Sequence, residues 1–232
     1  VSDLPEGSRR LLELAAVDGQ PLSIATVLDG AGLGPEGHRS IDALKSRNLL
    51  RSCGGDDDRV ECYHDRIREL LVSELDGDAL RERHGALARA LEDTEAPDPE
   101  RLSRHFEGAG RWIDASRSAE EAARLADEKL AFERAAQHYR RALALGNHEA
   151  ESSLTLRSRL ADALANAGLG WEAAPEYLSI AETGIPRLES LKLKCRAARL
   201  LLATGYFEEG CTILDEVLAE FGMRVTTTPW GA

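Results

Sequence analysis

The adjacent pair His64-Asp65 has the residue types that bind a transition metal in HD-type phosphohydrolases. Such a site also needs a second histidine upstream and a further aspartate downstream, both on partner helices. His38 is the only histidine upstream, and it falls in a different predicted element. The sequence therefore favours a structural role, in which Asp65 caps a helix and His64 packs at the end of a hairpin. An HD-type hydrolase remains a remote alternative.

Two other motifs have the residue types of a binding site but lack its remaining parts. The string formed by Gly30, Gly32 and Gly34 has no strand before it and no Lys-Ser/Thr after it, as a phosphate-binding loop requires. The aspartates at 56–58 form a short run in a turn, whereas a calcium loop needs alternating oxygen ligands and a distal glutamate. The sequence predicts no catalytic, cofactor-binding or metal-binding residue in this chain, and therefore no enzyme.

The cysteines do not indicate a metal site. Cys53, Cys62, Cys195 and Cys211 form no CxxC pair, and no histidine lies at a metal-ligand interval from any two of them. Without a visible secretory signal, reduced thiols and a cytoplasmic location are expected. Cys53 and Cys62 flank a predicted hairpin, so a disulfide between them is left open.

The composition is that of a soluble helical protein. Of 232 residues, 43% are hydrophobic and 30% charged, and the formal net charge of -12 argues against generic nucleic-acid binding. No apolar run reaches the roughly 18 residues that a membrane helix needs. Because the chain opens at Val1 and ends in TTTPWGA, we expect a segment of a larger protein.

The first 78 residues predict a winged-helix-like module. Periodicity indicates a helix over 6–17 that ends at Asp18-Gly19, and a second helix capped by Ser23. A third helix starts near Pro35 and is followed by a β-hairpin around the turn GGDDDR. The third helix carries the cations of a DNA-reading helix, so a DNA-binding transcription regulator is the main alternative function. These residues are His38, Arg39, Lys45 and Arg47.

Beyond the hairpin every predicted element is helical. Residues 79–110 are predicted as connecting helices, with the segment APDPE as the internal break, and 111–232 as degenerate repeats of tetratricopeptide (TPR) type. Each repeat places a small residue, a large residue four positions later, and a small or apolar residue three further on. Trp112 and Trp171 are expected to pack within the hairpins. The packing positions are Ala123, Ala135, Tyr139 and Ala142, then Ala161, Ala173 and Tyr177, then Ala198, Gly210 and Leu214.

The repeat spacing departs from the ideal. Ala135 and Ala173 are 38 residues apart, and Ala173 and Gly210 are 37 apart, rather than about 34. Stacked hairpins of this kind form an α-solenoid whose first helices line a face that can bind a peptide or a partner helix. The sequence predicts a locally basic partner groove made by Arg157, Arg159, Lys192, Lys194 and Arg196.

Several phrases of the sequence resemble a known family. They are YHDRIRELL (63–71), RERHGALARALE (81–92), LSRHFEGAGR (102–111) and LAFERAAQHYRRALAL (130–145). Their order is similar to the region just after the nucleotide-binding domain of bacterial signal-transduction ATPases of the STAND/AAA type. That ATPase is often fused to a serine/threonine kinase, a nucleotide cyclase or a LuxR-type output domain. The resemblance covers roughly residues 8 to 220.

The resemblance implies a function for the chain as part of a larger protein. ATP and Mg²⁺ would bind in the upstream domain, because neither a P-loop nor its acidic partner occurs in residues 1–232. The winged-helix-like unit would pack inside the protein rather than on DNA. We therefore expect a non-catalytic regulatory segment that couples a nucleotide-binding domain to protein-binding repeats. Its partners would be proteins, with no membrane and no nucleic acid.

Overall fold

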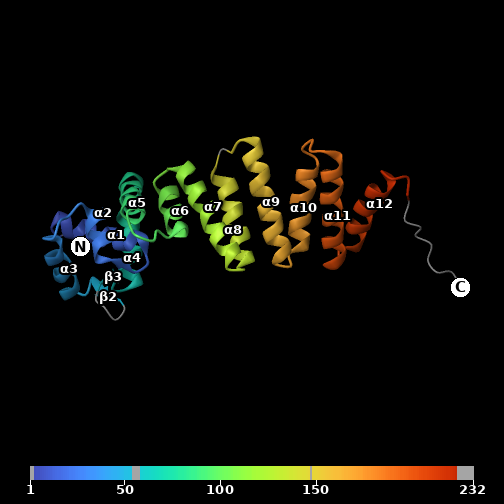
Figure 1. Ribbon diagram of the computed structural model, residues 1–232. Helices are drawn as coiled ribbons and strands as arrows, with labels where there is room; N and C mark the ends of the chain where they lie inside the picture. The colour runs from blue at the N-terminus through green and yellow to red at the C-terminus, as the bar shows by residue number, and fades with distance from the viewer. Residues whose placement is uncertain (1–2, 54–57, 147, 224–232) are drawn as a thin grey trace. The chain divides into compact units, whose positions relative to one another are not determined.

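Residues 3–53, 58–146 and 148–223 are described in a computed structural model of the chain, and they form helices and one small sheet (Figure 1). Contacts divide the chain into two compact units, Val1–Ser118 and Ala119–Ala232. The predicted fold class, mainly α with a small β-hairpin followed by TPR-like helical hairpins, is confirmed. The finer division into 1–78, 79–110 and 111–232 stays a prediction.

Local signals set the first helices of the N-terminal unit. Helix α1 (Glu6–Asp18) ends at Gly19, whose φ of 70° lies in the left-handed region that glycine adopts without strain. Helix α2 (Ile24–Ala31) begins at Ser23, whose Oγ accepts a 3.0 Å hydrogen bond from the Thr26 amide. Helix α3 spans Gly37–Ser46. These helices bury one apolar face each, which includes Leu11, Leu12, Val27, Ile41 and Leu44.

The sheet is antiparallel and has the strand order β1-β3-β2. The predicted hairpin is formed by β2 (Leu50–Ser52) and β3 (Arg59–Cys62), and the additional strand β1 (Leu22–Ser23) pairs with β3. In this register Cys62 lies opposite Leu50 rather than Cys53, and both cysteines are free thiols. Burial raises the pKa of each thiol to about 11. The disulfide that the sequence left open is therefore not formed.

The next three helices begin at an aspartate or directly after one. Helix α4 (Asp65–Glu74) has His64 as its N-cap, and that cap makes no side-chain hydrogen bond. The expectation that Asp65 caps this helix was therefore wrong, because His64 is still extended and Asp65 is the first helical residue. There its negative charge faces the positive end of the helix dipole. Asp76 and Asp98 do cap α5 (Gly77–Glu92) and α6 (Pro99–Gly108). The last two residues of the predicted break APDPE therefore belong to α6.

A buried polar network joins α1, α5 and α6. The carboxylate of Asp18 contacts Arg101 Nη2 at 2.6 Å, His105 Nε2 at 2.8 Å and Arg104 Nη2 at 3.1 Å. The His84 and His105 Nδ1 atoms are 3.0 Å apart. A neutral His105 carries its proton on Nε2 and donates a hydrogen bond from there to Asp18. Its Nδ1 atom then accepts a hydrogen bond from Nδ1 of His84. The network therefore fixes one arrangement of the three helices.

The same network sets the protonation states of its members. Burial alone would raise the pKa of Asp18, but the hydrogen bond with His105 and the charge of Arg101 outweigh it, so this pKa is lowered. Burial lowers the pKa of His105, which its bond with Asp18 only partly offsets. Burial beside His105 lowers the pKa of His84 to about 4. Both histidines are therefore neutral in the folded chain at neutral pH.

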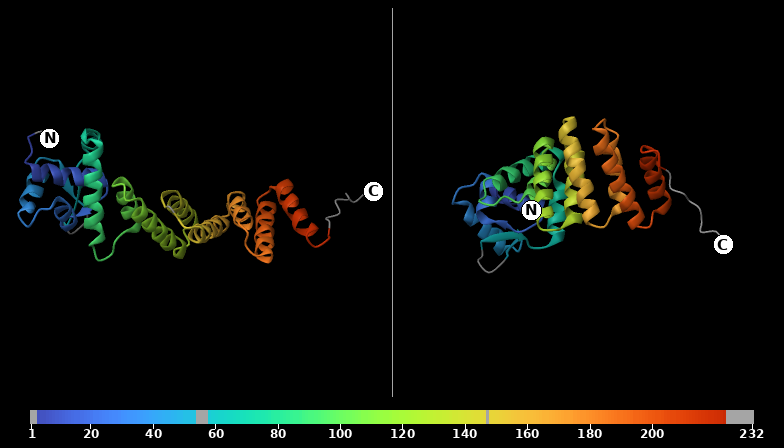
Figure 2. Two further views of the ribbon diagram at one scale, coloured as in Figure 1. Left: turned by 90° about the horizontal axis from the view of Figure 1, so that it is seen from above. Right: turned by 45° about the vertical axis from the view of Figure 1, so that its right-hand side comes forward.

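The second unit consists of antiparallel helical hairpins. Helix α7 (Trp112–Glu128) contains the boundary between the units and pairs with α8 (Phe132–Leu145). The later hairpins are α9 (Ala150–Asn166) with α10 (Gly170–Ala181), and α11 (Arg187–Ala203) with α12 (Phe207–Ala219). From α8 to α12 each helix packs against its predecessor (Figures 1 and 2). None of the helices in the described part of the chain has the length and apolar character needed to cross a membrane.

The turn within each hairpin has one backbone geometry. Its second residue has a positive φ, of 59° at Leu130, 78° at Gly168 and 91° at Gly205. The following amide then bonds back to the carbonyl five residues earlier, as Leu169 does to Leu164 at 2.9 Å. Glycine meets this requirement in two hairpins, whereas Leu130 meets it with a β-carbon and a side chain that is 72% exposed. Leu130 is thus the strained copy of a repeated turn.

We expect the N-terminal unit to lose stability in acid. A histidine whose pKa is lowered by folding stays neutral in the folded state while the unfolded chain takes up a proton below about pH 6.5. The unfolding free energy should therefore fall as the pH drops from about 6.5 towards the His84 pKa of about 4. After allowance for partial exposure, His84 should contribute on the order of 1 kcal/mol.

Hydrogen exchange of the α1 and α6 amides in the intact chain, corrected for intrinsic rates, measures this loss. His84→Gln removes one titrating group and should make the dependence on pH shallower. Equal slopes for His84→Gln and the wild type would contradict the assignment.

Leu130→Gly should stabilise the second unit. Glycine removes a left-handed backbone cost of about 1–2 kcal/mol, against about 0.5–1 kcal/mol of added unfolded-state entropy. The expected net gain in unfolding free energy is on the order of 0.5 kcal/mol. The matched reverse change, Gly168→Leu, should cost about 1–2 kcal/mol. Denaturant unfolding of both variants measures the difference, and a loss of stability in Leu130→Gly would show that its exposed side chain matters more than its backbone.

Candidate interaction surface

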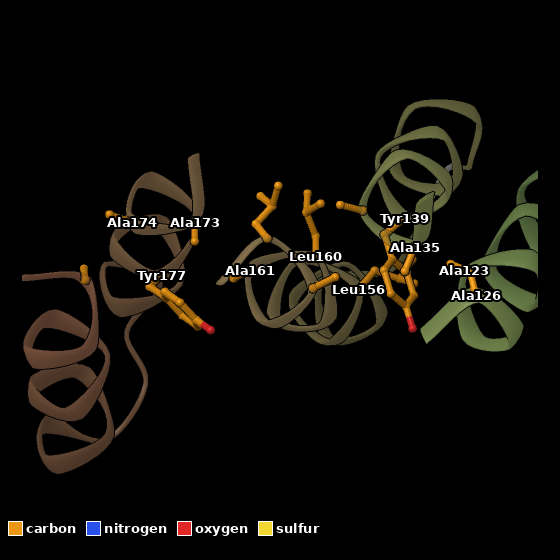
Figure 3. Packing of buried hydrophobic residues seen from close by; sticks show 14 of the residues in the cluster. Ala123, Ala126, Ala135, Tyr139, Leu156, Leu160, Ala161, Ala173, Ala174 and Tyr177 are labelled. Carbon is orange, nitrogen blue, oxygen red and sulfur yellow. The ribbon is translucent and has the colours of Figure 1, made fainter. Parts of the chain in front are cut away.

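The interface between hairpin helices is built from small residues with a tyrosine beside them. Ala135 and Ala173 are fully buried where α8 and α10 meet their neighbours, and Tyr139 and Tyr177 fill the adjoining space (Figure 3). Leu156 and Leu160 of α9 pack between the two tyrosines (Figure 3). The predicted packing positions are buried in the structure, with Leu214 half-buried; the others are Ala123, Ala142, Ala161, Ala198 and Gly210.

The helices from α10 to α12 approach one another closely at two glycines. A β-carbon on Gly210 would lie 2.7 Å from Leu202 Cγ and 3.1 Å from the carbonyl oxygen of Ala198. Gly170, at the start of α10, is similarly constrained, because its β-carbon would lie 2.8 Å from the Leu200 carbonyl oxygen of α11. Backbone atoms cannot move away cheaply, so these glycines are fixed by the stacking of helices rather than by turn geometry.

Tyr177 also anchors a polar contact between three helices. Its hydroxyl donates to Asp162 Oδ1 at 2.7 Å, and Arg196 Nη1 contacts the same oxygen at 2.7 Å. The Arg196 guanidinium also lies over the Tyr177 ring, 4.6 Å from its centre. Burial, together with the Asp162 charge, raises the pKa of the Tyr177 hydroxyl, which therefore stays protonated as a donor. Helices α9, α10 and α11 are joined at this point.

The predicted basic groove residues take part in a repeated set of ion pairs. Arg159 and Arg196, 37 residues apart, reach back to acids on the first helix of the preceding hairpin, Glu120 at 3.3 Å and Asp162 at 2.7 Å. Arg157 and Lys194, also 37 apart, contact acids on the second helix of their own hairpin. Lys192 pairs with Glu189 on its own helix at 2.8 Å.

These pairs change what the groove can offer a partner. Each of its five cations has a carboxylate within 4 Å, so its positive charge is offset locally. The side chains remain 30–60% exposed, and such pairs are weak enough in water to exchange partners. That these residues bind a partner stays a prediction. The sequence reading missed the acids, although their recurrence on successive helices could have indicated them.

Large apolar side chains lie exposed at the helix starts. Trp112 and Trp171 are 54% and 50% exposed, so the expectation that they pack within the hairpins was wrong. Both stand in the first turn of their helices, where a side chain points back past the helix end rather than into the neighbouring helix. Tyr206, the N-cap of α12, and Phe207, its first residue, are exposed as well.

The cations predicted on the third helix lie on α3 or directly after it. His38, Arg39 and Arg47 are exposed, and Lys45 is half-buried. The His38 Nδ1 atom is 3.0 Å from the Pro35 carbonyl oxygen, which ties this ring to the start of its own helix. Their part in DNA reading or in internal packing stays a prediction.

The His64-Asp65 pair, the glycine string and the aspartate run were the other motifs with the residue types of a site. His64 and Asp65 line a small pocket of about 170 Å³ together with Arg51, Glu61 and Arg68. In residues 3–53, 58–146 and 148–223, no three His, Cys, Asp or Glu side chains converge as metal ligands. Gly30 packs against α1 and α5, and Gly32 ends α2. Residues 56 and 57 lie outside the described part of the chain, while Asp58 is exposed.

Tyr177→Phe should destabilise the second unit by about 1 kcal/mol, because Asp162 loses a part-buried hydrogen-bond donor while the ring still fills its space. The control is Tyr206→Phe, an exposed tyrosine whose change should cost less than about 0.5 kcal/mol. Denaturant unfolding followed by circular dichroism measures both. An equal effect of the two changes would show that the Tyr177 hydroxyl does not join the helices.

Comparisons with known proteins show distant structural similarities. No protein-family model matches the sequence, and no curated protein matches it. Among solved structures, the chain is similar to a signal transduction ATPase with numerous domains (STAND) protein with a tetratricopeptide repeat sensor from Pyrococcus horikoshii. The identity is 15% and the TM-score 0.43, over 96% of this chain and 46% of that one. BtubC (BKLC) from P. vanneervenii is 14% identical with a TM-score of 0.35, over 90% and 96% of the two chains. The chain thus spans less than half the length of the Pyrococcus protein.

Proposed function

We propose that the chain is a non-catalytic regulatory segment of a larger signal-transduction ATPase, and that its helical repeats bind a protein partner. The observation that carries this proposal is the stack of α7–α12 hairpins with a repeated ladder of ion pairs along their first helices. Stacked hairpins present an extended surface of regularly spaced side chains, which suits a peptide or a helix rather than a small molecule. ATP and Mg²⁺ would bind in the nucleotide-binding domain that the sequence resemblance implies.

Buried contacts between helices of the N-terminal unit support a coupling role. Two buried contacts tie α1 to the following helices: Glu13 to Arg83 on α5 at 2.9 Å, and Asp18 to Arg101 on α6 at 2.6 Å. Removing one partner of a buried pair costs about 3–5 kcal/mol, so these contacts favour joint movement of α1, α5 and α6. A displacement of the winged-helix-like part by a neighbouring domain would therefore also move α6.

Coupling has a thermodynamic requirement. A partner changes the balance between two nucleotide states only if it binds one of them more tightly. By reciprocity, the nucleotide must then change the affinity of the chain for that partner by the same factor, typically about 5- to 150-fold. Affinity measured in two nucleotide states is therefore the quantity that tests the proposal.

Titration of the chain with the nucleotide-binding domain of its parent protein tests this function. Calorimetry in ADP and in a non-hydrolysable ATP analogue should give affinities that differ by about fivefold or more. Absence of binding in both states would contradict the coupling. Equal affinities would leave a docking role without regulation and would likewise contradict the proposal.

Two sets of variants test whether the predicted basic groove binds the partner protein. Lys192→Glu with Lys194→Glu reverses one exposed and one half-buried cation of the predicted groove, while Lys129→Glu changes an exposed lysine outside it. With an identified partner protein, the double change should weaken binding about tenfold, and the control change should weaken it by less than about twofold.

A further inference from the structure

Helix α12 presents an apolar seam that no helix in the described part of the chain covers. Within α12, Phe207, Cys211, Leu214 and Leu218 are spaced by four, three and four residues, and Phe221 follows three positions later. Phe207 and Phe221 are 65% and 60% exposed, Cys211 is exposed, and the two leucines are half-buried. Apolar residues with this alternating spacing lie in one line along a helix, as they do in coiled coils. We call these five residues the α12 seam.

The repeats themselves show what covers such a seam. The positions 37 residues earlier, on α10, are Gly170, Ala174, Tyr177 and Ala181, and all four are buried. Helix α11 packs on α10, and it leaves no room for a β-carbon at Gly170. The α12 seam therefore occupies the position at which α10 receives the first helix of the next hairpin. By comparison with α10, we expect a helix to cover the α12 seam.

Charge specifies the kind of helix. All charged residues of α12 and its last turn are acidic, and Glu208 and Asp215 lie on the exposed side that borders the α12 seam. Helix α11 carries five basic residues and a single acid, and two of its cations, Arg187 and Lys194, already pair with the α12-side acids Glu220 and Glu216. The flank of the α12 seam therefore matches a cationic partner, because opposite charges beside an apolar contact select the partner and its orientation.

We propose that the α12 seam is a docking surface for a cationic amphipathic helix that lies along α12, farther from it than α11 lies from α10 because Phe207 stands where α10 has Gly170. The inference rests on the proposed function as a protein-binding segment, and it names a surface distinct from the predicted groove together with the chemistry of its partner. Apolar side chains of the incoming helix would fill the line between Phe207 and Phe221, and its Lys and Arg residues would face Glu208 and Asp215.

A synthetic peptide with the sequence of α11, Arg187–Ala203, and with Ser in place of Cys195 is the probe. It should bind the intact 232-residue chain in a fluorescence-anisotropy titration. A control peptide in which every Lys and Arg is Glu keeps the apolar residues and should bind about tenfold more weakly or not at all. Equal binding of the two peptides would overturn the cationic specificity of the proposal.

Variants of the chain locate the binding surface. Phe207→Asp and Leu214→Asp each place a charge in the α12 seam and should weaken binding about tenfold or more. Thr212→Asp places the same charge on another side of α12 and should change it by less than about twofold. Because Phe207 is already largely exposed, Phe207→Asp does not depend on tolerance in the core. Undiminished binding to Phe207→Asp would overturn the proposal.

The two exposed cysteines supply a second measurement on the wild-type chain. Cys211 lies in the α12 seam and Cys195 lies on α11, while the raised pKa values of Cys53 and Cys62 slow their reaction. Bound peptide should slow maleimide labelling of Cys211 and leave that of Cys195 unchanged. Concentration-dependent dimers joined through Cys211 under mild oxidation would instead make a second copy of the chain the occupant. Neither failure would affect the nucleotide titration, which tests the proposed function separately.

Discussion

The close approach of helix backbones is the constraint on which the second unit depends. Where hairpin helices meet, the structure places Ala135, Ala173 and Gly210 at equivalent positions, and a β-carbon on Gly210 would already press on a neighbouring carbonyl. Small residues at these points let the helices come together, and Tyr139 and Tyr177 then fill the space beside them. Each hairpin completes its burial only against the next, so stability here is a property of the stack rather than of any single hairpin.

Charges act differently in the two units. In the N-terminal unit Asp18 and Glu13 are buried, and each depends on arginines from later helices, so loss of either partner leaves an uncompensated charge. In the repeats the corresponding pairs are exposed, and each contributes about 0–1 kcal/mol. The first arrangement specifies one packing of helices. The second leaves the helix faces adjustable, which suits a surface whose task is to meet another protein.

Signals within a few residues could be predicted from the sequence, and contacts between distant segments could not. The ends of α1 and α2 follow from Gly19, Gly32 and the Ser23 cap, and the repeat follows from small residues at a fixed period. Strand β1 is two residues long and exists only because β3 lies beside it, so no alternation could reveal it.

The same limit explains what the sequence reading missed at the sites. The carboxylate of Asp18 meets Arg101 across more than eighty positions of the chain. One local sign of it was available, because an acid in the last turn of a helix opposes the dipole and needs a partner. Leu130 was invisible for another reason: its left-handed backbone is imposed by the hairpin turn and is not favoured by leucine itself.

The composition of α12 departs from that of an end cap. A terminal helix that only closes a stack is expected to turn a polar face to water. At the positions where α10 has Gly170, Ala174 and Tyr177, α12 instead has Phe207, Cys211 and Leu214. Phe207 and Cys211 are larger than their α10 counterparts and are exposed, which costs solubility and gains no burial within the described hairpins. Gly210 allows α12 to pack closely against α11, as Ala173 does for α10 against its neighbour. The inner contact of α12 thus matches that of α10, and its outer face differs. That combination is what a docking face requires: a fixed base and an apolar line that another helix completes.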